Sequence, residues 1–118
     1  MNDEIIQLTE RLLAYNQLFL KTYQRSREEE VEQDFQEIIK PFVDEVKVIN
    51  DEWNNKMKIW LKEETHKHLH LKQIDNTTEH IVQLSIQCFF KKTSRSRFLN
   101  ANRTVEYFLL EVLKEIKT

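Results

Sequence analysis

Glycine is absent from all 118 residues of the sequence, and proline occurs once, as Pro41. Sheets with tight hairpins normally need Gly, Asn-Gly or Asp-Gly to reach positive φ, so a chain without glycine is poorly suited to them. Charged residues make up 32% and apolar residues 40% of the chain. This balance is typical of amphipathic helices and is too apolar for a disordered chain. The sequence therefore predicts an all-α protein.

Apolar residues recur every seven positions in four segments, which we interpret as helices over residues 3–24, 32–64, 72–91 and 96–117. In the second segment this repeat comprises Ile39, Val46, Trp53 and Trp60. The segments are joined by short polar connections at residues 25–30, 65–71 and 91–97. Four amphipathic helices with short connections favour an antiparallel up-down four-helix bundle. We expect a single domain over residues 1–118.

Pro41 lies inside the second segment and has no backbone N–H to donate to the carbonyl of Glu37, against which its ring also clashes. This predicts either a kink or a short lead-in turn over residues 34–40. The apolar repeat continues on both sides of the proline, which favours the kink. A straight helix of that length would also span roughly 50 Å, more than a compact domain of this size needs. We therefore predict that helix 2 is bent near Pro41.

Three short motifs resemble those of a known family. They are DFQEIIKP at Asp34–Pro41, the cluster of His70, Gln73 and Ile74, and the pair Arg97–Phe98. In order and spacing, over most of the chain, they resemble the YppE-like proteins of low-GC Gram-positive bacteria. The resemblance implies a cytoplasmic four-helix bundle whose biochemical role is uncharacterised, and a shared fold does not by itself assign a function.

Three histidines, His66, His68 and His70, alternate with other residues in the sequence THKHLHL. In an extended segment alternate side chains point the same way, and three imidazoles could then bind Zn²⁺ or Ni²⁺. On a helix only His66 and His70 would align, and no cysteine or carboxylate lies within the cluster. His66 and His68 are also not positions that the family resemblance covers. We expect exposed or helix-capping histidines, and we keep a bundle that binds a metal or a small ligand through these histidines as the third hypothesis.

The motifs of common enzymes are missing from the sequence. The Ser, Thr and Cys residues lack a G-x-S-x-G or Cys-His setting, and there is no glycine for a phosphate-binding loop. A di-metal bundle needs Glu-x-x-His on two helices, whereas only Glu63 and His66 have that spacing here. The sequence predicts neither an enzyme nor a bound cofactor.

A basic patch is predicted where the third and fourth helices meet, formed by Lys91, Lys92, Arg95, Arg97 and Arg103. The net charge is only −2, because the first half of the chain is acidic. The patch is expected either to face the acidic segment Glu28–Asp34 or to meet an acidic partner protein. Nucleic-acid binding through residues 91–103 is the alternative, although such domains are usually strongly basic overall.

Trp60 lies on the apolar repeat and is predicted to belong to the core, but near a bundle end it would be a candidate anchor for a partner. Cys88 is the only cysteine, so no internal disulfide can form. The first twenty residues lack the pattern of a signal peptide, and no apolar run is long enough to cross a membrane. We therefore expect a cytoplasmic, non-enzymatic protein-interaction module that binds an unknown protein partner or self-associates.

Overall fold

The computed structural model describes residues 2–29, 32–63 and 68–117. Within these ranges there are four α-helices, one five-residue π-helix and no strand. They are α1 (Asp3–Glu28), the π-helix η1 (Phe35–Ile39), α2 (Lys40–Glu63), α3 (Leu71–Gln87) and α4 (Arg95–Lys117). The all-α prediction is confirmed.

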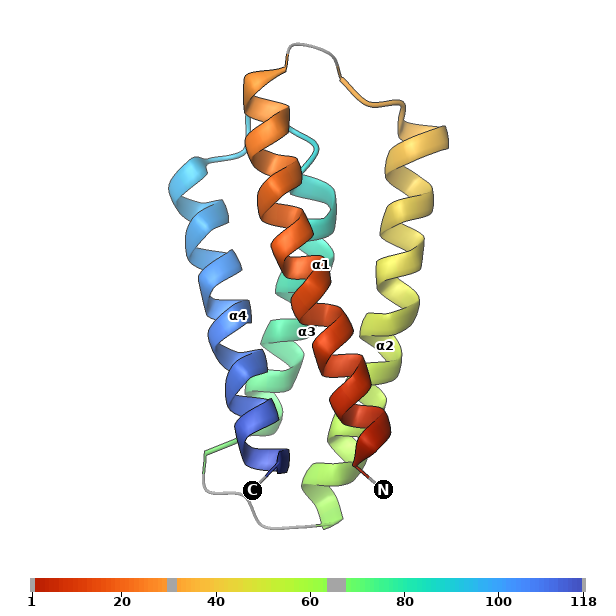
Figure 1. The fold of residues 1–118 in the computed structure, drawn as a ribbon, viewed down its shortest axis with the longest axis vertical. Helices are drawn as coiled ribbons and strands as arrows, with labels where there is room; N and C mark the ends of the chain where they lie inside the picture. The colour runs from red at the N-terminus through yellow and green to blue at the C-terminus, as the bar shows by residue number, and fades with distance from the viewer. Residues whose placement is uncertain (1, 30–31, 64–67, 118) are drawn as a thin grey trace.

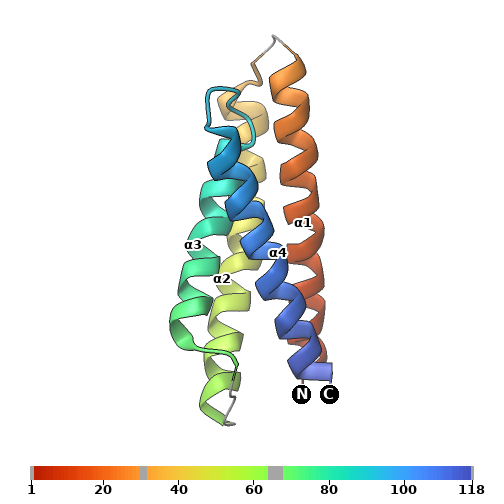
Figure 2. The same ribbon diagram turned by 90° about the vertical axis from the view of Figure 1, so that its left-hand side faces the viewer.

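The four α-helices form an antiparallel up-down bundle (Figure 1). Each helix packs against the next in the chain, and α1 also packs against α4, which closes the bundle. Both chain termini lie at one end, and Figure 2 shows the same arrangement from the side. The opposite end holds the α1–η1 connection and the α3–α4 corner. We call this the cap end and define it as residues 25–29, 32–38 and 88–97.

Helix α1 extends four residues beyond the predicted end at residue 24. Arg25 and Arg27 lie in its last turn, where cations interact favourably with the carbonyl end of the helix dipole. The backbone N–H of Glu29 donates to the carbonyl oxygen of Arg25 at 2.9 Å. The predicted connection at residues 25–30 therefore began too early. Helix α3 is shorter than predicted and ends at Gln87 rather than residue 91.

The predicted second helix over residues 32–64 begins later than expected. Asp34 has an extended backbone and its carboxylate accepts a hydrogen bond from the backbone N–H of Glu37 at 2.8 Å, as an N-cap residue does. The first helical turn is the wide π-turn η1, in which the N–H of Lys40 bonds to the carbonyl of Phe35. Because α2 starts at Lys40, the chain enters it through η1, which corresponds to the short lead-in turn predicted as the alternative to a kink. The change from π-helix to α-helix lies next to Pro41.

The core is formed by the predicted apolar repeats of all four helices. Residues of the second repeat, from Ile39 to Trp60, are buried, and the ring of Trp53 meets Phe108 of α4 edge to face. Trp53 also donates from Nε1 to the hydroxyl of Thr9 on α1 at 2.9 Å. The buried amides of Asn16 and Asn102 link α1 to α4 by hydrogen bonds of 2.9 Å. These polar contacts fix how the helices are placed relative to one another.

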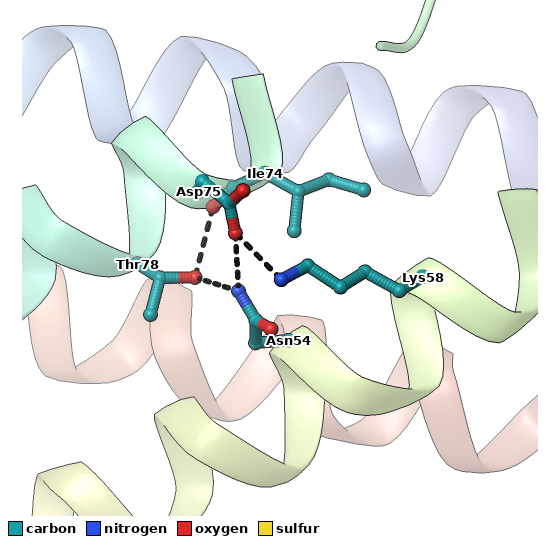
Figure 3. A network of polar contacts seen from close by, with 5 residues as sticks. All are labelled: Asn54, Lys58, Ile74, Asp75 and Thr78. Atoms are coloured by element: carbon teal, nitrogen blue, oxygen red, sulfur yellow. Dashed lines mark hydrogen bonds and ion pairs between the residues drawn. The ribbon is translucent and has the colours of Figure 1, made fainter. Parts of the chain in front are cut away.

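A polar network joins the outer edges of α2 and α3 (Figure 3). The amide of Asn54 donates to Thr78 Oγ1 at 2.8 Å and to Asp75 Oδ1 at 3.3 Å, while Lys58 Nζ lies 2.8 Å from the same oxygen of Asp75. Hydrogen bonds from Lys58 and then Asn54 hold the pKa of Asp75 below its usual value. The Thr78 hydroxyl donates back to the carbonyl of Ile74 at 2.8 Å.

Candidate functional site

A cavity of about 290 Å³ lies at the cap end, between α1, the α1–η1 connection, η1 and the end of α3. Its lining combines apolar and charged side chains. Ile38, Phe89 and Phe90 form its apolar part, and Arg25, Lys91 and Lys92 contribute cations, while Glu29 and Glu32 contribute carboxylates. The remaining lining is polar and comprises Thr22, Ser26 and Gln33.

An aromatic cluster supports the floor of this cavity. Phe42 of α2 meets Phe89 edge to face with ring centroids 5.6 Å apart, and it meets Phe19 of α1 in the same way at 6.0 Å. Edge-to-face pairs of this kind add to the stabilisation gained from burial alone. Phe89 is thus held in place at the end of α3, next to the exposed Phe90.

Side chains of α1 tie the α3–α4 corner to the rest of the bundle. Tyr23 stacks on Phe98 with ring centroids 4.1 Å apart, and its hydroxyl donates to the carbonyl of Thr93 at 2.7 Å. Ser26 Oγ donates to the carbonyl of Cys88 at 2.9 Å. The corner is therefore anchored by its backbone, which leaves its charged side chains directed to solvent.

Two sets of opposite charges lie on the cap end. We call Lys91, Lys92, Arg95 and Arg97 the basic corner, and Glu28, Glu29, Glu32 and Asp34 the acidic link; all eight side chains are exposed. In the part of the chain that the structure describes, none of the ion pairs includes a member of either set. The predicted proximity of the patch and the acidic segment is present in part, because Lys91 and Lys92 line the same cavity as Glu29 and Glu32. It does not take the form of ion pairs between described residues.

The structure divides the predicted basic patch. Lys91 and Lys92 lie at the cavity, whereas Arg95 and Arg103 line a shallow depression on α4 together with Leu99 and Asn100. The first turn of α4 contains no acidic residue, and the hydroxyl of Ser94 accepts a hydrogen bond from the backbone N–H of Arg97 at 3.5 Å.

Trp60 is 4% exposed and belongs to the hydrophobic core. It is a core residue, as its position on the apolar repeat predicts, and its ring is not available to anchor a partner in this structure. The large exposed apolar residues of the cap end are instead Phe35, Ile38 and Phe90, whose exposed fractions are 54%, 45% and 41%. Sequence reasoning missed Phe35 and Ile38 because they were assigned to a regular α-helix, in which their side chains would point elsewhere than in a π-turn.

The histidine cluster is only partly described, since His66 lies outside the described residues. His70 is the N-cap residue of α3, and its backbone N–H donates to Gln73 Oε1 at 2.8 Å, one half of a capping box. His68 is exposed and lines a groove of about 400 Å³ between α3 and α4, together with His80 and Glu111. Among the described residues, no three His, Cys, Asp or Glu side chains come close enough together to hold a metal ion.

Cys88 is buried at the end of α3. Burial raises the pKa of its thiol to about 12, and the thiol donates to the carbonyl of Ser85 at 3.4 Å. A thiol with this pKa is protonated at neutral pH and therefore does not act as a nucleophile.

None of the helices in the described ranges combines the length and apolar character that a membrane crossing requires.

Residues 9–116 match the model of a bacterial domain family of unknown function, DUF1798. The chain belongs to this family. It is 24% identical to the uncharacterised protein YppE of Bacillus subtilis over 98% of its own length and 94% of that protein. The resemblance to YppE-like proteins, predicted from three short motifs, is thereby confirmed.

Solved structures of related bacterial proteins share this fold. A crystal structure of a Listeria innocua protein of unknown function superimposes with a TM-score of 0.92 at 28% identity, covering 97% of this chain and 91% of that one. The crystal structure of B. subtilis YppE, a structural genomics target, gives a TM-score of 0.94 at 24% identity, with 99% and 95% covered. These similarities support the four-helix fold, and they do not assign an activity to it.

Proposed function

We propose that this chain is a cytoplasmic, non-enzymatic protein-interaction module that binds its partner through the cap end. The observation that carries the proposal is the combination, around one cavity, of exposed apolar side chains with exposed charges that form no ion pair within the described residues. Apolar side chains in a charged rim are typical of protein-binding surfaces.

Charge at the cap end favours a protein partner over nucleic acid. A polyanion that approaches Lys91 and Lys92 also approaches Glu29 and Glu32, which lie around the same cavity and would repel it. A protein can instead place groups of both signs opposite the corresponding charges. The cytoplasmic assignment is supported by the single, buried cysteine, which suits a reducing compartment.

The proposal is tested by affinity capture from the cytosol of the native organism, treated with nuclease and analysed by mass spectrometry. The unmodified chain is compared with K91E/K92E and with a control, K72E/K117E, which makes the same charge change at exposed positions outside the cap end. We expect that the cap-end variant loses a captured protein that the control retains. Equal capture by all three chains would refute binding through the cap end.

A further inference from the structure

We propose that the cap end binds a second copy of this chain, so that two bundles pair about a two-fold axis with the acidic link of each over the basic corner of the other. This inference rests on the proposed function and names the partner. The two charge sets occupy neighbouring parts of one end of the bundle. The acidic link lies at the end of α1 and on the chain that leads to η1. The basic corner lies on the turn from α3 to α4 and on the first turn of α4, at the same end of the bundle (Figures 1 and 2).

A second copy fits this surface because the surface is complementary to itself. A uniformly acidic partner would be attracted by Lys91 and Lys92 but repelled by Glu29 and Glu32, and a uniformly basic partner would meet the reverse problem. The partner must therefore carry both signs on separate parts of its surface. In a two-fold dimer the acidic link of each copy meets the basic corner of the other, so the same contact forms twice and the cap end itself satisfies that requirement.

Apolar contact is expected between the two charged contacts. Ile38 and Phe90 line the cavity that lies between the acidic link and the basic corner, and both are more than one-third exposed. Pairing two cap ends would remove these side chains from water in both copies. The shorter dimensions of the bundle are 27 and 20 Å. An end of that size could bury an interface area on the order of 500 Å² per copy. This is at the small end of the range for specific interfaces, where complexes are weak and transient.

The test is sedimentation equilibrium of the purified full chain together with two charge-reversed variants. K91E/K92E cancels the net positive charge of the basic corner, and E29K/E32K cancels the net negative charge of the acidic link. The original chain is expected to dimerise at low salt, with a dissociation constant that rises with ionic strength because exposed charges are screened. In each variant alone the altered patch has no net charge and its substituted residues repel the unaltered patch of the second copy, so the dissociation constant should rise by about tenfold or more.

A one-to-one mixture of the two variants tests whether dimerisation depends on contact between the acidic link and the basic corner. In the mixed pair the unaltered acidic link of one variant meets the unaltered basic corner of the other, and at the second contact the introduced glutamates face the introduced lysines. Heterodimers should therefore form with a dissociation constant within about threefold of that of the original chain. The control K72E/K117E, altered outside the cap end, should dimerise as the original chain does. Circular dichroism verifies that each variant is folded, and the salt dependence of the unaltered chain provides a readout that needs no variant.

Several results would overturn the dimer. A chain that is monomeric at low salt and millimolar concentration refutes it, as does a dimer that both variants form unchanged, since its interface would then lie elsewhere. Tight binding of DNA or RNA that K91E/K92E abolishes would assign the basic corner to nucleic acid instead. A monomer that still loses a captured protein on K91E/K92E substitution would refute the second copy as partner while supporting the proposed function.

Discussion

Replacing Asn102 with alanine should destabilise the bundle more than any exposed substitution on α4. Asn102 Nδ2 donates to both the carbonyl and the side-chain oxygen of Asn16 at 2.9 Å, and both residues are buried. The alanine variant removes both hydrogen bonds and leaves the Asn16 oxygens without that donor. Each buried polar group left in this way costs about 1–3 kcal/mol, so a loss of about 2–4 kcal/mol in the free energy of unfolding is expected.

Urea denaturation followed by circular dichroism measures this loss, and Asn100→Ala is the matched control. Asn100 lies on the same helix and is exposed, so its replacement should change the free energy of unfolding by about 0.5 kcal/mol or less. The double variant Asn16→Ala/Asn102→Ala should be less destabilised than the sum of the two single variants, with a coupling of about 0.5–3 kcal/mol. Equal effects of Asn102→Ala and Asn100→Ala, or strictly additive single variants, would refute the assignment of this pair as a link between α1 and α4.

Three further predictions follow from the burial, ionisation and backbone of single residues. Cys88 should resist thiol reagents at pH 8 in the folded protein and react in urea, because burial raises the pKa of its thiol to about 12; fast reaction in the folded state would contradict its burial. Because the pKa of Asp75 is lowered in the folded protein, its ionised carboxylate stabilises the fold at pH values above 3.8, the ordinary pKa of this group. This stabilisation is lost as the pH falls through the lowered pKa. Asp75→Asn should therefore make the free energy of unfolding depend less steeply on pH in the acid range. An unchanged pH dependence would contradict the hydrogen bonds assigned to Asp75. Pro41→Ala should keep the helical circular dichroism signal, since the π-turn precedes the proline; loss of the fold would show that the proline is required.

The fold was predictable because its core follows a regular pattern. A seven-residue apolar repeat identifies which side of each helix is buried, and residues such as Val46 and Trp53 are fully buried as expected. Helix ends were less predictable, because they depend on contacts between distant segments. At the end of α3, for example, the hydroxyl of Ser26 on α1 donates to the carbonyl of Cys88, and nothing in the local sequence signals that contact.

The candidate site was only partly predictable for the same reason. Lys91 and Lys92 are visible as a basic cluster in the sequence, but the cavity is also lined by Arg25 of α1 and Ile38 of η1. These residues come from three separate segments, and the exposure of Ile38 follows from a π-turn that the apolar repeat does not reveal. Trp60 is buried, as its place on the apolar repeat predicts, and its burial gives no support to the alternative of a partner anchor, because position near a helix end does not determine exposure.

The most direct test of binding through the cap end is a concentration series of ¹H–¹⁵N correlation spectra of the unaltered chain at low salt. Amide shifts that depend on concentration should be confined to residues 25–29, 32–38 and 88–97, and they should diminish when salt is added. The opposite end of the bundle, around Glu63 and Lys117, should remain unchanged. Spectra that do not change with concentration, or shifts centred away from the cap end, would contradict self-association through this surface.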